Sequence, residues 1–168
     1  MKPKLILGLV LVLSGGLFGC KMAEHSDEPT IYHSTKYNFT FSLPASWRGY
    51  SVLIGQWQGK TYFPATDKTA EVEHGPTITL RNPHWAAGNP YQDIPIAVFT
   101  RIQWDGYHHG KFSPYVGGIA EELWHNDKYV FAIHSRYNAN DGVNGWKEVE
   151  DIITQNRAVH PEPALYPE

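Results

Sequence analysis

The sequence predicts an α+β domain built on a central antiparallel β-sheet of about five or more strands with flanking helices. Three observations predict it. Most strand-like segments come before the stronger of two helical patterns, the strands do not alternate regularly with helices, and the aromatic content is high: six Trp, ten Tyr and seven Phe. We expect a single domain over residues 37–157, because the part of the chain that follows a predicted signal peptide is long enough for one hydrophobic core.

Five segments have the pattern of β-strands. In Tyr37–Leu43 large apolar side chains alternate with Asn, Thr and Ser, which is typical of a half-buried strand. In residues 94–104 the alternation extends through Ile102 and Trp104, so we expect one long strand there, with Pro95 near its start. The other predicted strands are residues 50–57, 77–81 and 128–137.

Two segments have the pattern of helices. Residues 118–126 carry Ile119 and Leu123 four positions apart, which predicts a short helix. Residues 145–157 carry an apolar stripe at helical spacing, formed by Trp146, Val149, Ile152 and Ile153. Asn144 or Asp141 is expected to cap this second helix.

The segment "YNFTFSLPASW", Tyr37–Trp47, resembles the opening of the PsbP-like and DcrB-like families. In both, an aromatic strand leads into a Leu-Pro pair and a Trp. The resemblance implies a small sandwich with a central antiparallel sheet and flanking helices, and the DcrB-like family includes envelope lipoproteins. The order of the strand at 128–137 and the helix from Trp146 is also similar to that of these families.

The N-terminus has the pattern of an exported lipoprotein. Lys2 and Lys4 precede the apolar run Leu5–Leu13, which is typical of a signal peptide and short for a membrane span of about 20 residues. The segment "LFGC", Leu17–Cys20, resembles a bacterial lipobox. The resemblance implies removal of residues 1–19 and acylation of Cys20 with diacylglycerol, rather than a thiol buried in the core.

The residues around the domain are expected to form a tether and a tail. Residues 20–36 are polar and unpatterned, and we expect them to connect the lipid to the domain. Residues 158–168 contain three prolines and are expected to form a flexible tail. Lys21, rather than Asp, follows the cysteine, and the resemblance then implies the outer membrane in a cell that has one.

The charge of the chain argues against nucleic acid as a partner. Removal of Lys2 and Lys4 with the signal peptide lowers the number of basic residues from 14 to 12 and leaves 17 acidic residues, a net charge of −5. Such a surface repels phosphate backbones. Cys20 is the single cysteine, so no intramolecular disulfide is expected, and stability must come from packing of the aromatic side chains.

Common catalytic motifs are absent from the sequence: it contains no Gly-x-Ser-x-Gly, no His-Glu-x-x-His and no phosphate-binding glycine loop. We therefore expect a protein without catalytic activity and predict no cofactor. The alternative is a metal-dependent enzyme or metal-binding protein that uses Asp105, His108 and His109 of the segment "WDGYHHGKF". Glu122 and His125 have the spacing of di-iron bundles, but a single copy favours ordinary surface polarity.

The segment "RNPHWAAGNPYQD", residues 81–93, is the leading candidate for a ligand-binding loop. It combines two Asn-Pro-type turns with two aromatic residues, and loops carry binding residues more often than strands do. The candidate contacts are Asn82, His84, Trp85, Asn89 and Tyr91, with Trp104 and Tyr107 as outer members if the two loops meet. The alternative interpretation is that Trp85 folds back and covers a sheet edge.

A possible anion site completes the candidates. Arg101, His134 and Arg136 are expected on the outward faces of two strands, where they would share one surface if the strands are neighbours. The alternative is an ordinary solvated sheet face. Together these features favour a non-catalytic envelope lipoprotein that binds a ligand or a partner protein, with the membrane, an envelope protein or a glycan as its expected partners.

Overall fold

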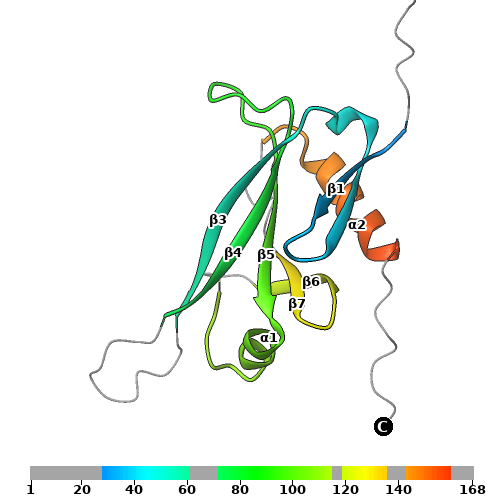
Figure 1. Cartoon of the computed structure of the whole chain (residues 1–168). Helices are drawn as coiled ribbons and strands as arrows, with labels where there is room; N and C mark the ends of the chain where they lie inside the picture. Colours follow the sequence, from blue (N-terminus) through cyan, green and yellow to red (C-terminus); the bar gives the residue numbers. More distant parts are fainter. Residues whose placement is uncertain (1–27, 61–71, 115–118, 136–142, 160–168) are drawn as a thin grey trace, which may run out of the picture.

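A computed structural model of the chain describes residues 28–60, 72–114, 119–135 and 143–159. These residues form an α+β fold with a five-stranded antiparallel sheet, a two-stranded antiparallel sheet and two α-helices (Figure 1). The strand order of the larger sheet is β3-β4-β5-β7-β6. Neither helix of the described part of the chain is long and apolar enough to cross a membrane.

The elements follow one another as a series of hairpins. The smaller sheet pairs β1 (Thr30–Ser34) with β2 (Phe39–Leu43), and a 3-10 turn, η1 (Ala45–Trp47), follows. The larger sheet consists of β3 (Ser51–Lys60), β4 (Val72–Arg81), β5 (Ile94–Thr100), β6 (Ala120–His125) and β7 (Tyr129–His134). The helices are α1 (Arg101–His108) and α2 (Trp146–Val159).

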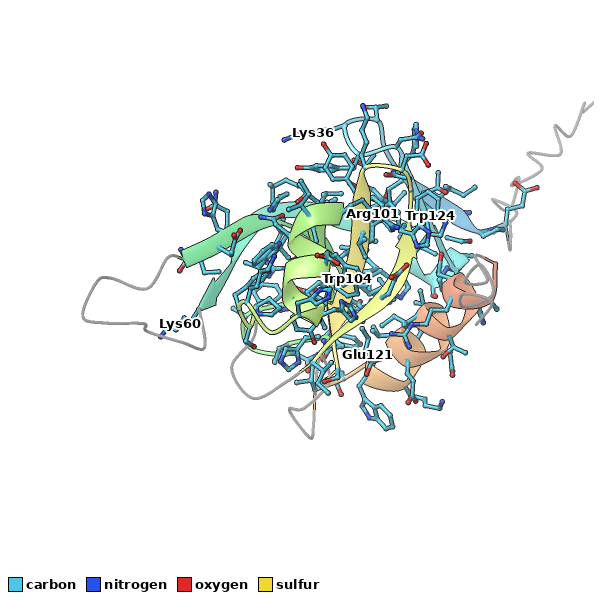
Figure 2. The ribbon with its side chains drawn as sticks, turned by 90° about the horizontal axis from the view of Figure 1, so that it is seen from below. Lys36, Lys60, Arg101, Trp104, Glu121 and Trp124 are labelled. Carbon is cyan, nitrogen blue, oxygen red and sulfur yellow. The ribbon has the colours of Figure 1, made fainter. Side chains whose placement is uncertain are left out.

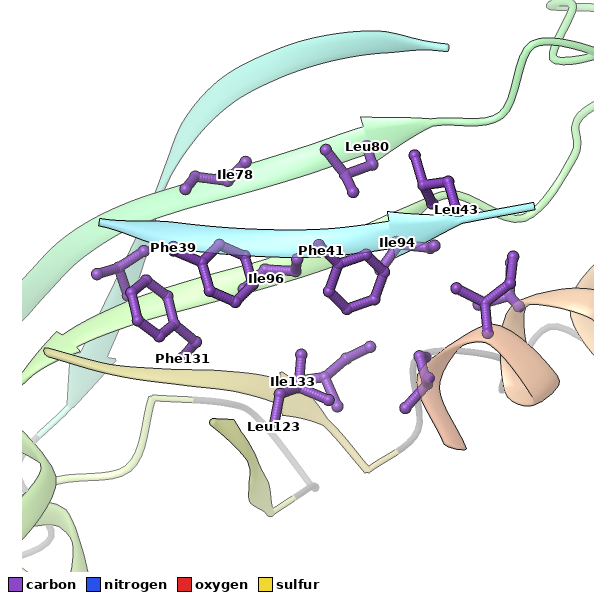
Figure 3. Packing of buried hydrophobic residues seen from close by; sticks show 14 of the residues in the cluster. Phe39, Phe41, Leu43, Ile78, Leu80, Ile94, Ile96, Leu123, Phe131 and Ile133 are labelled. Atoms are coloured by element: carbon purple, nitrogen blue, oxygen red, sulfur yellow. The ribbon is translucent and has the colours of Figure 1, made fainter. Parts of the chain in front are cut away.

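The main core lies between the two sheets and α2 (Figure 3). The predicted alternation of β2 is confirmed, because Phe39, Phe41 and Leu43 are almost fully buried between exposed Thr40 and Ser42. The predicted stripe of α2 is confirmed for Val149, Ile152 and Ile153, whereas Trp146 is 45% exposed. Together these side chains meet the inner faces of β4, β5 and β7, which contribute Ile78, Leu80, Ile94, Ile96, Val98, Phe131 and Ile133.

The neighbouring strands β5 and β7 of the larger sheet are buried on both faces. Val98 of β5 belongs to the main core, while its neighbours Ala97 and Phe99 belong to a second cluster on the opposite face. Trp57 stacks on Phe99 within this second cluster, with ring centroids 4.3 Å apart, and donates its indole N–H to the Val98 carbonyl. Helix α1 contributes Trp104 and Tyr107 to the same cluster.

The prediction of one strand over residues 94–104 is wrong, because β5 ends at Thr100 and α1 begins at Arg101. A capping box causes the change. The Thr100 hydroxyl accepts the Gln103 N–H, and the Gln103 side chain accepts the Thr100 N–H. Ile102, expected on the buried face of a strand, is 83% exposed.

The prediction of a helix over residues 118–126 is also wrong, because Ala120–His125 forms the edge strand β6. The register with β7 shifts between Glu122 and Trp124, and this irregularity lies at Leu123, which is buried. Hydrogen bonds to β7 and the burial of Ala120 and Leu123 outweigh the weak helical propensity of the segment.

The tether predicted over residues 20–36 is wrong for its last part, because Thr30–Ser34 is strand β1. This strand pairs with β2, and the Tyr32 ring contacts Phe39 and Tyr50, each with centroids 6.4 Å apart. The pairing supplies hydrogen bonds that the sequence pattern of β1 alone did not indicate. Residues 1–27, including Cys20, and residues 160–168 lie outside the described residues.

Asn156 connects α2 to β2 through hydrogen bonds that the sequence analysis did not identify. The side chain is 7% exposed. Its Oδ1 accepts the Ser42 N–H at 2.8 Å, and its Nδ2 donates to the carbonyls of Ser42 and Ile152, each at 2.9 Å. The helix is therefore held in register with the small sheet by a polar contact as well as by apolar packing.

We expect Asn156→Ala to lower the free energy of unfolding by roughly 1–3 kcal/mol, because the Ser42 N–H and carbonyl lose their partner at a poorly hydrated site. Urea unfolding followed by tryptophan fluorescence measures the change. Thr154→Ala is the matched control: its exposed hydroxyl bonds only the Glu150 carbonyl of the same helix, so its effect should stay within about 0.5 kcal/mol. Equal losses in both variants would contradict the role of Asn156.

Candidate functional site

The predicted binding loop, residues 82–93, connects β4 to β5 and is closed at its base by an ion pair. Arg81 Nε lies 3.2 Å from Asp93 Oδ2, and Asp93 Oδ1 accepts the Asn82 N–H at 2.9 Å. The Asn82 side chain accepts the His84 N–H, and the Asn82 carbonyl accepts the Trp85 N–H. One carboxylate and one amide thus fix the first turn of the loop.

The tip of the loop is also held in place. Ala86 and Asn89 exchange both backbone hydrogen bonds and form a tight turn. Asn144, just before α2, donates its side-chain amide to Asn89 Oδ1 at 2.7 Å, and its carbonyl accepts the Gln92 N–H at 2.8 Å. The loop is therefore attached to the start of α2 and is preorganised.

Within this frame the five predicted contact residues have different environments. Asn82 is 2% exposed, and its Nδ2 has no hydrogen-bond partner among the residues that the structure describes, so Asn82 organises the loop from inside. Tyr91 is half-buried, and its ring lies 5.5 Å from that of His84. His84, Trp85 and Asn89 remain exposed.

Trp85 is not part of the hydrophobic core, and its side chain is held against Arg81. The Arg81 guanidinium lies over its ring at 4.0 Å from the centroid, and the residue keeps 36% of its surface exposed. Arg81 is itself held by Asp93, so the cation–π contact fixes the orientation of the indole. The exposed part of the ring offers a flat apolar surface.

Trp104 and Tyr107, predicted as outer members of this site, lie elsewhere. Both are on α1, at the opposite end of β5 from the loop (Figure 1), and Figure 2 shows Trp104 on that helix. Their rings pack into the second cluster, and the Tyr107 hydroxyl accepts the Ala120 N–H. The two surfaces are separate, and α1 does not extend the loop site.

The three predicted metal ligands do not come together as a set: His109 Nδ1 lies 3.3 Å from Asp105 Oδ1, but His108 does not join this pair. His108 Nδ1 lies 3.0 Å from the Trp104 carbonyl, and His109 Nδ1 lies 2.9 Å from the Asp105 carbonyl. The Nδ1 atom of each histidine thus faces the carbonyl of the residue four positions earlier, because His108 is the last residue of α1 and His109 is its C-cap. Across the described ranges, no group of three His, Cys, Asp or Glu side chains is placed to hold a metal ion.

Glu122 and His125 are paired, but on a strand. His125 Nδ1 contacts Glu122 Oε1, and the register irregularity in β6 brings the two side chains to the same side. The spacing that helices use for di-iron ligands is therefore coincidental here.

The predicted anion site is not formed in the part of the chain that the structure describes. β5 and β7 are neighbours, as the hypothesis required. Arg101, however, starts α1 beside Lys128, which precedes β7, while His134 ends that strand about 20 Å further along. Arg136 lies outside the described residues.

Two described groups have displaced pKa values, and neither belongs to a predicted site. Partial burial, reinforced by Tyr32, raises the pKa of the Tyr50 hydroxyl. Hydrogen bonds to Asp151 and Glu150 raise the pKa of the Lys147 ammonium on the exposed side of α2. Both groups thus keep their usual neutral and charged forms around pH 7.

No family model, no curated protein and no solved structure matches this chain. The candidate site therefore depends on its own geometry. Arg81, Asp93 and Asn144 are essential to that geometry and were absent from the predicted set. A sequence signal existed for the first two, because they are the opposite charges that bound the loop, whereas Asn144 is 55 residues away from its partner Asn89.

We expect Gly145→Ala to loosen the attachment of the loop to α2. Gly145 has φ +79°, which L residues rarely adopt, and an added Cβ would lie 3.1 Å from Tyr91 Cδ1. The substitution should cost roughly 1–3 kcal/mol of unfolding free energy. Gly88→Ala, in the same loop but with open space around its Cα, is the control and should change stability little, as measured by urea unfolding. The expectation fails if the two variants are equally stable.

Proposed function

We propose that this protein is an exported, non-catalytic lipoprotein that presents the 82–93 loop to a ligand or partner in the cell envelope. The observation that carries the proposal is the state of Trp85, an indole held by Arg81 on a braced loop and left more than a third exposed. A monomer that needed Trp85 only for packing would bury it further. Preorganised aromatic side chains bind by stacking at low entropic cost.

Membrane attachment is proposed through an acylated Cys20, in the outer membrane of a cell that has one. Support comes from the lipobox-like "LFGC" segment and from Lys21 after it. Strand β1 begins at Thr30, so ten residue steps separate the proposed anchor from the sheet, a reach of at most about 36 Å. The domain would therefore work close to the membrane surface.

A PsbP-like or DcrB-like sandwich is the proposed finer classification of the fold. The support is local: β2 leads through Leu43 and Pro44 into η1, and Trp47 of this turn is completely buried. That arrangement explains why an aromatic strand, a Leu-Pro pair and a Trp occur together. The rival metal-dependent function receives no such support, because its three ligands do not converge.

The chemistry of the loop limits the ligand. Most polar groups at the base of the loop bond one another, so orientation must come from His84 and from the free hydrogen-bonding capacity of Asn89. Stacking on a single indole contributes about 0.5–1.5 kcal/mol beyond area burial, so one copy of the domain should bind weakly. A sugar ring of an envelope glycan or a flat side chain of an envelope protein satisfies both conditions.

We expect mass spectrometry of the protein isolated from bacterial membranes to show a diacylglycerol-modified N-terminus at Cys20. Cys20→Ala should remove the modification and release the protein from the membrane fraction. Intact Met1 together with an unmodified thiol would contradict the anchoring proposal and leave the loop proposal untouched.

We expect Trp85→Ala to lose the envelope components that the native protein retains in a pull-down from envelope extract. The free energy of unfolding of this variant, measured by thermal unfolding, should fall by well under the 3–5 kcal/mol that truncation of a buried Trp costs, because the ring is partly exposed. Ile102→Ala, which truncates an exposed apolar side chain at the other end of β5, is the control and should retain the components. A large loss of stability in Trp85→Ala, or equal retention by both variants, would count against the site.

A further inference from the structure

Apart from Lys60, which pairs with Ser113, the outer edge of β3 lacks the usual features that prevent strand edges from pairing. β3 ends the larger sheet, and its ten residues pair with β4 without a register shift (Figure 1). Natural edge strands are protected by charges, prolines or bulges. Ser51–Gly59 contains no charged residue and no proline, and its apolar residues Val52, Leu53 and Ile54 are 40%, 39% and 70% exposed.

The direction of the backbone groups along this edge follows from two observations. Lys60 exchanges both of its backbone hydrogen bonds with Ser113, on the side away from β4. The same alternation explains the position of Pro76. This residue of β4 lies opposite Gln56 of β3, at a pair where no N–H directed toward β3 is required. Since alternate residues of a strand face the same side, Val52, Ile54, Gln56 and Gln58 direct their N–H and C=O groups outward.

The exposed side chains extend both faces of the sheet. Val52 and Ile54 lie opposite Leu80 and Ile78, which are buried in the main core. Val52 and Ile54 therefore continue that face of the sheet, but they are themselves exposed. Leu53 projects to the other face, and so does Gly55, whose Cα has open space around it. Among the residues that the structure describes, none pairs with the outward backbone groups of Val52 and Ile54, and apolar side chains lie above and below this part of the edge.

We propose that a second copy of this chain pairs with β3 in antiparallel orientation, with a two-fold axis through Leu53. In this register Val52 lies opposite Ile54 of the second copy, and the two residues exchange both backbone hydrogen bonds because both direct those groups outward. Leu53 meets its own equivalent in a non-hydrogen-bonded pair on the other face. Every apolar side chain of the edge thus meets another, as an isologous contact requires.

The neutrality of the paired segment and its self-complementary register favour a copy of the chain as the occupant, and the small area sets the strength of the contact. The chain without residues 1–19 has a net charge of −5, but the paired segment is neutral, so self-pairing brings no like charges together in the ladder. A five-residue ladder is about 17 Å long, and its buried area falls well below the roughly 800 Å² per partner of a stable interface. The dimer is therefore weak and concentration-dependent, and it does not depend on the proposed ligand of the 82–93 loop.

Cysteine cross-linking of the full chain in membranes tests the register. In Leu53→Cys the two Cα atoms face each other at about 4.5 Å, within reach of a disulfide. In Gly55→Cys each residue lies opposite Ser51 of the second copy, and the two cysteines are about 13 Å apart along the strands, too far to be bridged. Mild oxidation should give a covalent dimer for Leu53→Cys and no more than the native chain, with its Cys20, for Gly55→Cys.

A charge on the edge tests the same contact without reliance on a new disulfide. Sedimentation equilibrium of the full chain in density-matched detergent should show dimerisation weakened roughly tenfold or more by Ile54→Lys. Ile102→Lys introduces the same change at an even more exposed isoleucine on α1 and should leave dimerisation unchanged. Cross-linking at both cysteine positions, cross-linking at neither, an adduct with a different protein in place of the dimer, or equal effects of the two lysines would each overturn the proposal.

Discussion

The stacking of Phe39 on Phe131 is the contact on which the rest of this fold depends. The two rings are nearly parallel with centroids 4.1 Å apart, and they join β2 of the small sheet to β7 of the large one. Trp124 stacks on both rings and extends the contact to the β6 edge. Because Cys20 is the only cysteine of the chain, no disulfide joins the layers, and each aromatic pair adds about 0.5–1.5 kcal/mol to the area it buries.

Because β7 is buried on this face of the sheet, its apolar residues on the opposite face also need to be covered. Val130 and Ala132 point away from Phe131 and are equally buried, as are Ala97 and Phe99 of β5. Such strands need cover on both sides. The capping box at Thr100 turns the chain out of the sheet and into α1, and this places the rings of Trp104 and Tyr107 over the second cluster. The aromatic residues of α1 thus serve packing, which removes them from the candidate ligand contacts.

Elements that carry their own burial pattern were predictable from the sequence. β2 and α2 could be identified because strict alternation of apolar and polar residues fits a strand and not a helix, whereas apolar residues at helical spacing fit a helix and not a strand. The segments at 94–104 and 118–126 were misassigned, since Ile102 and Trp104 extend a strand pattern by coincidence, and Ile119 and Leu123 fit a helix as well as a bulged strand. Only the Thr100-x-x-Gln103 pair, a capping-box pattern, distinguishes helix from strand in the first case.

In the candidate site, too, the features with a local sequence signal could be predicted and those that depend on distant residues could not. The loop itself could be located from its Asn-Pro turns and its aromatic residues, which are local signals. Its bracing could not, because Asn144 reaches Asn89 across 55 residues and Gly145 makes room for Tyr91 only in the folded chain. Asn82, chosen as a polar ligand contact, is consumed within the loop, which shows that residue type alone does not separate a contact from a support.

The two proposed surfaces suit partners of different kinds because they leave different groups unpaired. In the 82–93 loop the side chains of Asp93 and Asn82 accept the backbone N–H groups of Asn82 and His84, so recognition depends on side chains, chiefly the indole of Trp85. Along residues 51–59 of β3 the side chains are neutral and the backbone of Val52 and Ile54 faces outward, so pairing there depends on the main chain and on strand register. Side-chain recognition selects a ligand by shape, whereas main-chain pairing accepts any compatible strand and is made selective by symmetry. A membrane-attached population would bring copies of the edge together at high effective concentration, and a weak self-contact of this kind would then present several 82–93 loops to one extended ligand.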